Sequence, residues 1–358
     1  MHVVYTSFII LFYLTACSVS SISLDVMRPA EISISQNIQN ILIINRSLPS
    51  KSNTAENILD GILSGENIGD DKKGSEMCVV GLRNSLLNNN MQLSRFNIID
   101  ADGFMSGEYL KGTGTSDFPK PIKWKKINKL ANNYTVDALI VLETFDSESR
   151  VLNAGLVERN KFKKGKKIKI KMIEALLNID VYAGWRIYDV KEEKIIDEKV
   201  FFDQKSFSAS GLTFGDAKTK LPNKRNAISE AGIFAGEQYA ARISPTLETV
   251  TRLFYQKAKR SSKKENESFK KAADFLKRDK IAAAASIWTY YVDNSDAQIA
   301  GRACFNMALA SELKNKYKLA LDWINKAIAY DNEKAQNYAS TLEDRQSKYK
   351  KIQQQLKK

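Results

Sequence analysis

The sequence has a single histidine, His2, at the extreme amino terminus. Histidine is the side chain that most often acts as a general base, activates a nucleophile or binds a transition metal near neutral pH. We expect His2 to be removed with an amino-terminal signal, which would leave the mature chain without imidazole. The sequence therefore argues against most hydrolase mechanisms, and we expect a protein that is not an enzyme, with no catalytic residue, no cofactor and no metal site.

Cysteine is also scarce, with residues at positions 17, 78 and 304 only. No two of them have the short spacing of a zinc or redox site. Cys78 begins an apolar helical pattern and Cys304 lies on the packed face of another. Both are therefore expected to be buried as small hydrophobic residues.

One apolar run stands near the start, where residues 3–16 read VVYTSFIILFYLTA. The run is too short for an ordinary membrane span and ends in Leu14-Thr15-Ala16-Cys17, which resembles a bacterial lipobox. That resemblance implies cleavage before Cys17 and acylation of its thiol and new amine. No Lys or Arg precedes the run, unlike the usual signal, and the alternative is a plain secretory signal or an amino-terminal anchor.

The segment after Cys17 favours a location. Residues 18–22 carry no acidic side chain, and resemblance to lipoprotein sorting signals then implies the outer membrane rather than the inner one. We expect a signal peptide over residues 1–16, a tether over 17–37 and a lipid anchor in the outer membrane at Cys17. Both the periplasmic and the surface side of that membrane are compatible with the sequence.

Positive charge is unevenly distributed over the chain, whose formal net charge is +14. From residue 257 to the end there are 22 basic and 12 acidic residues, which leaves +4 for everything before. A basic tail that contains aromatic residues could bind nucleic acid. The export signal argues against that partner, and the lysines are spaced as on solvated helix faces.

Residues 38–255 have the pattern of an α/β domain. Short apolar strands are expected over 38–46, 96–99 and 138–145, and amphipathic helices over 76–88 and 124–133. This alternation is typical of parallel strands joined by helices. Period-two patterns over 177–190 and 195–202 then predict a hairpin, so the sheet is expected to be mixed.

The segment from Lys161 to Met172, KFKKGKKIKIKM, contains seven lysines and no acid. Lysine alternating with isoleucine over 167–171 predicts an edge strand with one face buried, where charge discourages pairing with other molecules. The alternative is contact with lipid headgroups or another anionic surface.

Two further loops contain residue types that are found at ligand-binding sites. Asp100 and Asp102 directly follow the second strand, where α/β sheets often bind ligands. Aspartate is also common at this position because it forms turns, and we prefer this interpretation to ligand binding. The loop Gly112-Thr-Gly-Thr115 lacks the spacing and the lysine of a phosphate-binding loop.

The rest of the chain is expected to be helical. In a helix over 226–243, Gly232, Gly236 and Ala240 form a stripe for close packing, and Ser244-Pro245 then ends that helix. A further helix over 246–259 and a polar linker over 256–266 are expected to join the first domain to a helical domain over 267–358.

Residues 302–332, RACFNMALASELKNKYKLALDWINKAIAYDN, predict two amphipathic helices in contact. Small residues at Ala308, Ala320 and Ala327 fall where the backbones approach, and this spacing resembles a tetratricopeptide repeat. A degenerate copy precedes it by about 36 residues, and a last helix over 335–356 becomes steadily more polar. The resemblance implies a surface that binds other polypeptides.

Four phrases spread over the chain carry a wider resemblance: VMRPAEISI with NIQNILIINRS, AGEQYAARISPTLETVTRLFY and AGRACFNMALASELKNKY. With the lipobox they resemble a family of bacterial (Bacteroidetes-type) outer-membrane lipoproteins that have a carboxy-terminal tetratricopeptide-like region and no assigned activity. More loosely, the element order over 38–243 is similar to penicillin-binding-protein activator lipoproteins and the curli secretion subunit.

Two functions are compatible with these patterns. In the first, the protein is a lipid-anchored envelope adaptor or assembly factor that holds a protein partner through its helical repeats. In the second, the α/β domain binds a small molecule or glycan and the helices only support it.

The lipobox assignment predicts the behaviour of one variant. Cys17→Ser removes the thiol that would be acylated, so the protein should leave the membrane fraction or accumulate uncleaved. Cell fractionation and the mass of the amino-terminal peptide measure both outcomes. A Cys17→Ser protein that is cleaved normally and stays membrane-bound would contradict the assignment.

Overall fold

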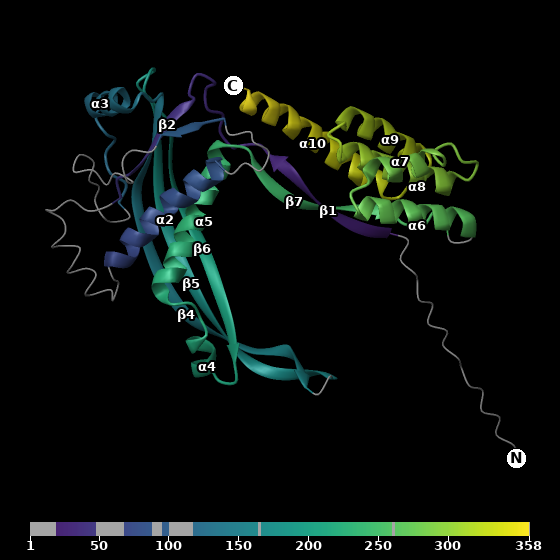
Figure 1. Ribbon diagram of the computed structural model, residues 1–358, viewed down its shortest axis with the longest axis horizontal. Helices are drawn as coiled ribbons and strands as arrows, with labels where there is room; N and C mark the ends of the chain where they lie inside the picture. The colour runs from purple at the N-terminus through teal and green to yellow at the C-terminus, as the bar shows by residue number, and fades with distance from the viewer. Residues whose placement is uncertain are drawn as a thin grey trace, which may run out of the picture. The chain divides into compact units, whose positions relative to one another are not determined.

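The computed structural model describes residues 19–47, 68–87, 95–99, 117–163, 166–259 and 262–357 (Figure 1). These residues form two compact units. The α/β unit comprises residues 29–246 with 352–358, and the helical unit comprises 247–351 with the segment that ends at Arg28. The expected order of an α/β region with a mixed sheet followed by an all-helical region is confirmed.

The α/β unit contains a five-stranded sheet in the order β3-β2-β4-β5-β6. Its strands are β2 (Asn40–Asn45), β3 (Asn97–Ile99), β4 (Ala138–Lys163), β5 (Lys166–Asp189) and β6 (Lys194–Gly211). The first three are parallel to one another, while β4, β5 and β6 pair antiparallel. The sheet is therefore mixed, with its parallel strands together at one side.

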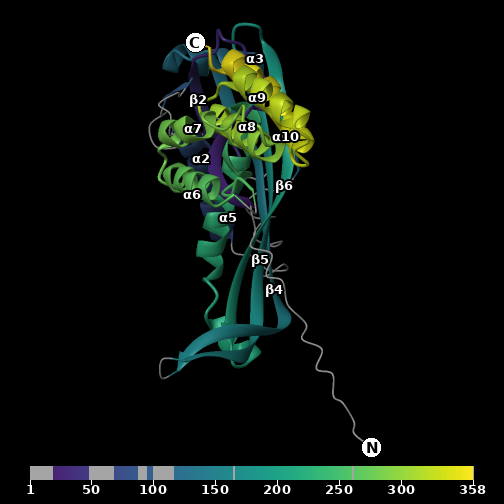
Figure 2. The same ribbon diagram turned by 90° about the vertical axis from the view of Figure 1, so that its right-hand side faces the viewer.

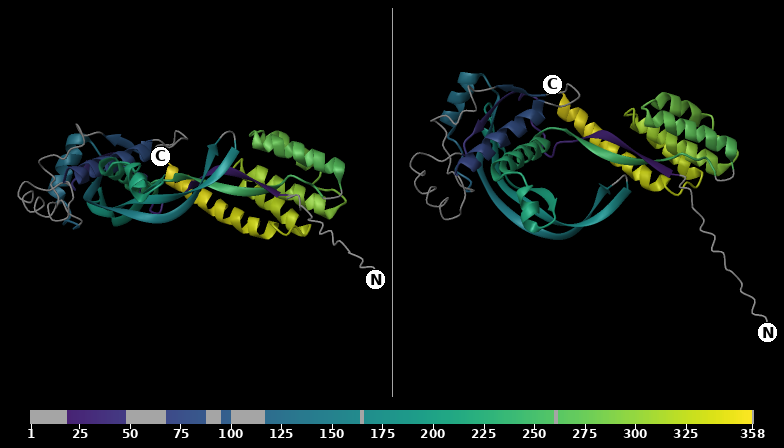
Figure 3. Two further views of the ribbon diagram at one scale, coloured as in Figure 1. Left: turned by 90° about the horizontal axis from the view of Figure 1, so that it is seen from below. Right: turned by 60° about the horizontal axis from the view of Figure 1, so that its bottom comes forward.

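Helices cover both faces of the parallel part. Helix α3 (Trp124–Tyr134) packs on one face, and α2 (Ile68–Leu87) and α5 (Lys224–Ile243) pack side by side on the other (Figure 3). Successive residues of β2 alternate between these two cores, Ile41 facing α2 and α5 and Leu42 facing α3. Burial on both faces explains why this strand is apolar throughout.

The contact between α2 and α5 depends on the predicted small-residue stripe. A Cβ atom at Gly236 would overlap the carbonyl oxygen of Cys78, and one at Gly232 would overlap that of Gly74. The two backbones thus approach more closely than any larger side chain permits. Helix α5 ends where predicted, because the N–H of Ser244 bonds to the carbonyl of Ala240 and no helical residue follows.

Strands β4, β5 and β6 are much longer than predicted, and a short helix, α4 (Phe214–Thr219), follows β6. The apolar run that marked β4 ends at Phe145, yet the strand continues for another 18 residues. Beyond that point polar and apolar residues mix along the strand, so the apolar criterion misses the extension.

The lysine-rich segment lies in the hairpin of β4 and β5. Residues 166–172 pair with β4 only, since the pairing of β5 with β6 begins at Ile173. The segment is therefore an edge, as predicted. Its expected buried face is wrong: Ile168 is 37% exposed and no described side chain from Lys167 to Met172 is fully buried.

The helical unit has five helices among its described residues: α6 (Lys263–Lys277), α7 (Ile281–Thr289), α8 (Ala297–Glu312), α9 (Tyr317–Ala329) and α10 (Ala335–Leu356). They pack as successive hairpins, α6 on α7 and α8 on α9 (Figure 2). Ala308, Ala320 and Ala327 are fully buried at the α8–α9 contact, as the spacing predicted.

Residues 246–259 were predicted to form a helix, and this was wrong. They form β7 (Thr246–Tyr255), which pairs with β1 (Val19–Arg28) in a two-stranded sheet. Thr246, Thr249, Val250 and Thr251 are β-branched and favour a strand. The expected tether over 17–37 likewise contains this first strand.

No helix in the described part of the chain combines the length and the apolar character needed to cross a membrane.

The α2–α5 contact predicts opposite effects for two glycines. Gly236→Ala should lower the free energy of unfolding of the α/β unit by roughly 1–3 kcal/mol, because the new methyl group overlaps backbone. Gly69→Ala, where nothing lies within 4 Å of the added atom, should raise it by roughly 0.5–1 kcal/mol. Thermal melts of the two variants measure this, and equal melting temperatures would contradict the assigned packing.

Candidate functional site

A buried polar cluster lies where the parallel strands end, at the position where open α/β sheets usually bind ligands. Glu143 is fully buried at a register shift in β4. Arg46, just after β2, donates to its Oε2 at 2.6 Å. Arg186 and Tyr188 of β5 donate to its Oε1 at 3.2 and 2.7 Å.

Arg186 links this cluster to the segment before α3. Its Nη1 donates to the carbonyl of Pro119 at 2.6 Å, its Nε donates to Glu198 at 2.5 Å, and its guanidinium lies 4.2 Å from the centre of the Phe118 ring. Burial lowers the pKa of Arg186, but the hydrogen bond to Glu198 and the charge of Glu143 outweigh it, so that the pKa is raised. The residue stays cationic.

Tyr188 completes the cluster as a neutral donor. Burial and the neighbouring Glu143 carboxylate raise the pKa of the phenol well above its ordinary value. Its hydroxyl also accepts a hydrogen bond from the N–H of Ile122 at 3.0 Å. Since these groups bond to one another, the arrangement fixes residues 118–122 on the sheet and gives Glu143 three hydrogen-bond donors.

The other sequence-predicted positions add no chemistry here. Cys17, Asp100, Asp102 and residues 112–115 lie outside the described residues. Within the described part of the chain, no three His, Cys, Asp or Glu side chains are placed to hold a metal ion.

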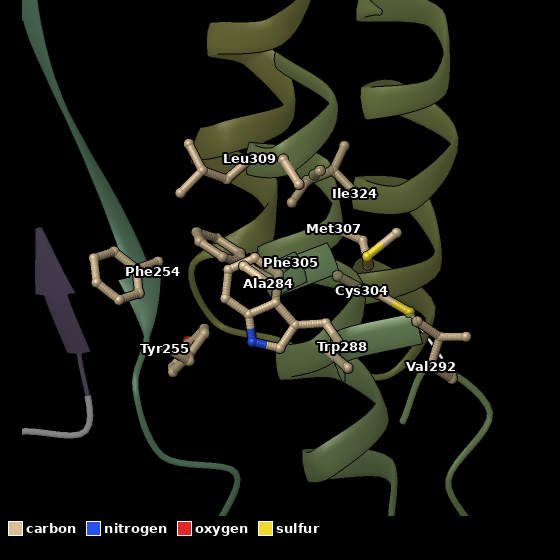
Figure 4. Close-up of a cluster of buried hydrophobic side chains, with 14 of the residues drawn as sticks. Phe254, Tyr255, Ala284, Trp288, Val292, Cys304, Phe305, Met307, Leu309 and Ile324 are labelled. Atoms are coloured by element: carbon tan, nitrogen blue, oxygen red, sulfur yellow. Dashed lines mark hydrogen bonds between the residues drawn. The ribbon is translucent and has the colours of Figure 1, made fainter. Parts of the chain in front are cut away.

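Cys78 and Cys304 are buried, as predicted. Burial raises the pKa of the Cys78 thiol far above its ordinary value and that of Cys304 to about 11. The Cys304 thiol donates to the carbonyl of Val292 at 3.6 Å (Figure 4). Neither thiol is a thiolate near neutral pH, so neither is a nucleophile.

The helical unit contains a second buried polar site, in which α8 binds the end of strand β7. The Asn306 side chain is fully buried. Its Oδ1 accepts from the N–H of Tyr255 at 2.8 Å, and its Nδ2 donates to the carbonyl of the same residue at 2.7 Å. One side chain thereby satisfies both backbone groups of an extended residue, which would otherwise be buried unpaired.

Aromatic packing surrounds this contact. Phe254 and Tyr255 enter the core of the helical unit beside Phe305 and Trp288 (Figure 4). The rings of Tyr255 and Phe305 are edge-to-face with centroids 5.3 Å apart, and the Arg302 guanidinium lies 4.7 Å from the Tyr255 ring centre. Burial of such rings contributes most of the energy of a contact of this kind.

A buried ion pair holds the preceding part of β7. Arg252 donates from Nε and Nη2 to both oxygens of Glu312, at 2.9 to 3.1 Å, and the Tyr338 hydroxyl donates to Glu312 at 2.6 Å. Burial lowers the pKa of Arg252, but the bond to Glu312 outweighs it and the pKa is raised. Removing one partner of such a pair costs about 3–5 kcal/mol. Strand β7 is therefore firmly attached to the helices.

Sequence reasoning found one half of this site. The helix that carries Asn306 was predicted within residues 302–332, and α8 is found there with Asn306 fully buried. Its partner Tyr255 was missed because β7 was expected to be helical. The β-branched residues of this segment were the available signal, but the preceding Ser244-Pro245 led to the prediction that a helix starts there.

The outer face of α9 differs from the inner contact. Leu319 is 42% exposed, and Trp323 and Lys326 follow it at helical spacing, with the Lys326 ammonium 4.8 Å from the Trp323 ring centre. Residues at i, i+4 and i+7 lie on one side of a helix. Large side chains left partly in water on one helix face are suited to contact another protein.

Comparison with known proteins gives two family matches. The family described as Domain of unknown function (DUF8603) matches residues 38–255, and that described as Domain of unknown function (DUF6340) matches residues 270–356. No curated protein matches the chain. The matched ranges lie on either side of the predicted linker, 256–266, and that boundary stays a prediction.

Proposed function

We propose that this chain, which belongs to the family described as Domain of unknown function (DUF8603), is an adaptor or assembly factor of the cell envelope and has no enzymatic activity. It is anchored in the outer membrane by lipid on Cys17 and holds a protein partner through its helical hairpins. The observation that carries the proposal is the outer face of α9, with exposed Leu319 beside Trp323.

The contact between α8 and β7, on the inner face of the helical hairpins, supports this choice of surface. Arrays of helical hairpins bind extended peptides along one face. Here Asn306 holds the chain's own strand β7 in that way. An external peptide would have to break the buried Arg252–Glu312 pair to take the same place, so we assign the partner to the outside of the array.

An anchor at Cys17 would lie close to the helical unit along the chain. Cys17 precedes the first residue of β1, Val19, by two positions. Two residues span at most about 7 Å. A lipid on Cys17 would thus hold the helical unit next to the membrane surface, where it meets other envelope proteins.

The alternative function, ligand binding by the α/β unit, has less support. Where the parallel pairing of β2 with β4 ends, the side chain of Glu143 bonds to Arg46, Arg186 and Tyr188. A ligand at this place would compete with these bonds.

Photo-crosslinking in living cells tests the adaptor proposal. A photoreactive residue at position 322, one turn from Leu319, should give an adduct of discrete mass. The same residue at exposed Lys191, in the α/β unit, should not. Adding Leu319→Ser should lower the yield at 322 at least about tenfold, as for a central contact residue. Adding Leu87→Ser, another leucine with similar exposure, should leave it unchanged.

Two results would contradict this function. One is equal adducts from positions 322 and 191, and the other is an adduct at 322 that Leu319→Ser does not reduce.

A further inference from the structure

The hairpin of β4 and β5 continues beyond the sheet as a two-stranded ribbon, whose described residues are 156–163 and 166–172. Strand β6 stops pairing at Ile173, and the ribbon reaches past its end (Figure 2). A register shift between Asn153 and Gly155 marks the point where the ribbon leaves the sheet. Gly155 has φ +89°, a left-handed conformation that favours glycine, and such bulges bend strands.

The ribbon concentrates the positive charge of the first 256 residues. Residues 156–172 contain eight basic side chains and one acidic side chain, a net charge of +7. The remainder of residues 1–256 contains 25 basic and 28 acidic residues. The eight are Arg159, Lys161, Lys163, Lys164, Lys166, Lys167, Lys169 and Lys171.

Only a small part of this charge is neutralised within the ribbon. Glu158 pairs with Lys169 at 2.9 Å, and both side chains are more than half exposed. Glu174, two residues beyond the ribbon, pairs with Arg159. Exposed pairs of this kind contribute little to stability, so folding does not explain why so many lysines gather here.

Apolar side chains are exposed next to these charges. Leu156 is 70% exposed and is paired in register with Ile173, whose partner on β6 is Gly211. Leu212 follows at 76% exposure, and Leu152 is 47% exposed. Exposed leucines at the base of a basic ribbon are not a solubility device, because lysine alone would serve that purpose better.

We propose that this ribbon binds an anionic lipid surface. Lysines attract headgroup phosphates, each contributing to binding, while leucines enter the boundary between headgroups and acyl chains. The lysines rule out a neutral bilayer as the favoured target, and the leucines favour a lipid surface over a soluble polyanion. The inference does not depend on an anchor at Cys17.

Vesicle sedimentation tests the inference with the chain from Ser18 to Lys358, which keeps every described residue and removes both the apolar run and Cys17. It should bind vesicles of phosphatidylcholine with phosphatidylglycerol, not those of phosphatidylcholine alone, and salt should weaken binding. Lys167→Glu, Lys169→Glu and Lys171→Glu together should weaken it roughly 100-fold.

A matched control uses three exposed lysines of the same unit, changed as Lys123→Glu, Lys125→Glu and Lys126→Glu, which should change binding less than about threefold. Leu156→Ser should weaken it, whereas Leu87→Ser should not. Thermal melts establish that each variant is folded.

Three outcomes would overturn the inference. They are no binding to anionic vesicles, equal loss in the ribbon and control triple variants, and full competition by inorganic polyphosphate together with no effect of Leu156→Ser.

Discussion

The contact of Asn306 with the backbone of Tyr255 determines how the helical unit is built. A strand end placed among helices would leave an N–H and a carbonyl buried without partners, at a cost of about 1–3 kcal/mol each. Asn306 supplies one acceptor and one donor at the distances required, 2.8 and 2.7 Å. The aromatic side chains of Phe254 and Tyr255 can then enter the core, so that β7 packs as part of the helical unit.

This arrangement has a consequence for function. The buried polar side chains described above bond to other groups of the chain, Asn306 and Glu312 in the helical unit and Glu143 in the α/β unit. Such groups stabilise and position elements, and they are not available to an external ligand. Function is therefore assigned to exposed features, namely the outer face of α9 and the basic ribbon.

The sequence was sufficient to predict the elements whose pattern of buried residues is local in the chain. The two-sided burial of β2 and the small residues Gly236, Ala308 and Ala320 leave patterns that identify parallel strands and close helix contacts without further information. Long-range pairing left no such pattern. Strand β7 pairs with β1, more than 200 residues earlier in the chain, and the extension of β4 beyond Phe145 is stabilised by neighbouring strands rather than by its own apolar residues. The partner of Asn306 could not be identified for the same reason, since its identity depends on where β7 lies.

Hydrogen–deuterium exchange at the Tyr255 amide tests most directly whether the inner face of the helical hairpins is permanently occupied by β7. If it is, the amide exchanges only when the whole helical unit unfolds, at a rate that matches the amides in the middle of α8. It should remain as slow when Leu319→Ser is introduced on the outer face. Exchange of Tyr255 much faster than that of α8 would mean that β7 detaches locally. The inner face would then be open to an external peptide, contrary to the assignment of the partner to the outside.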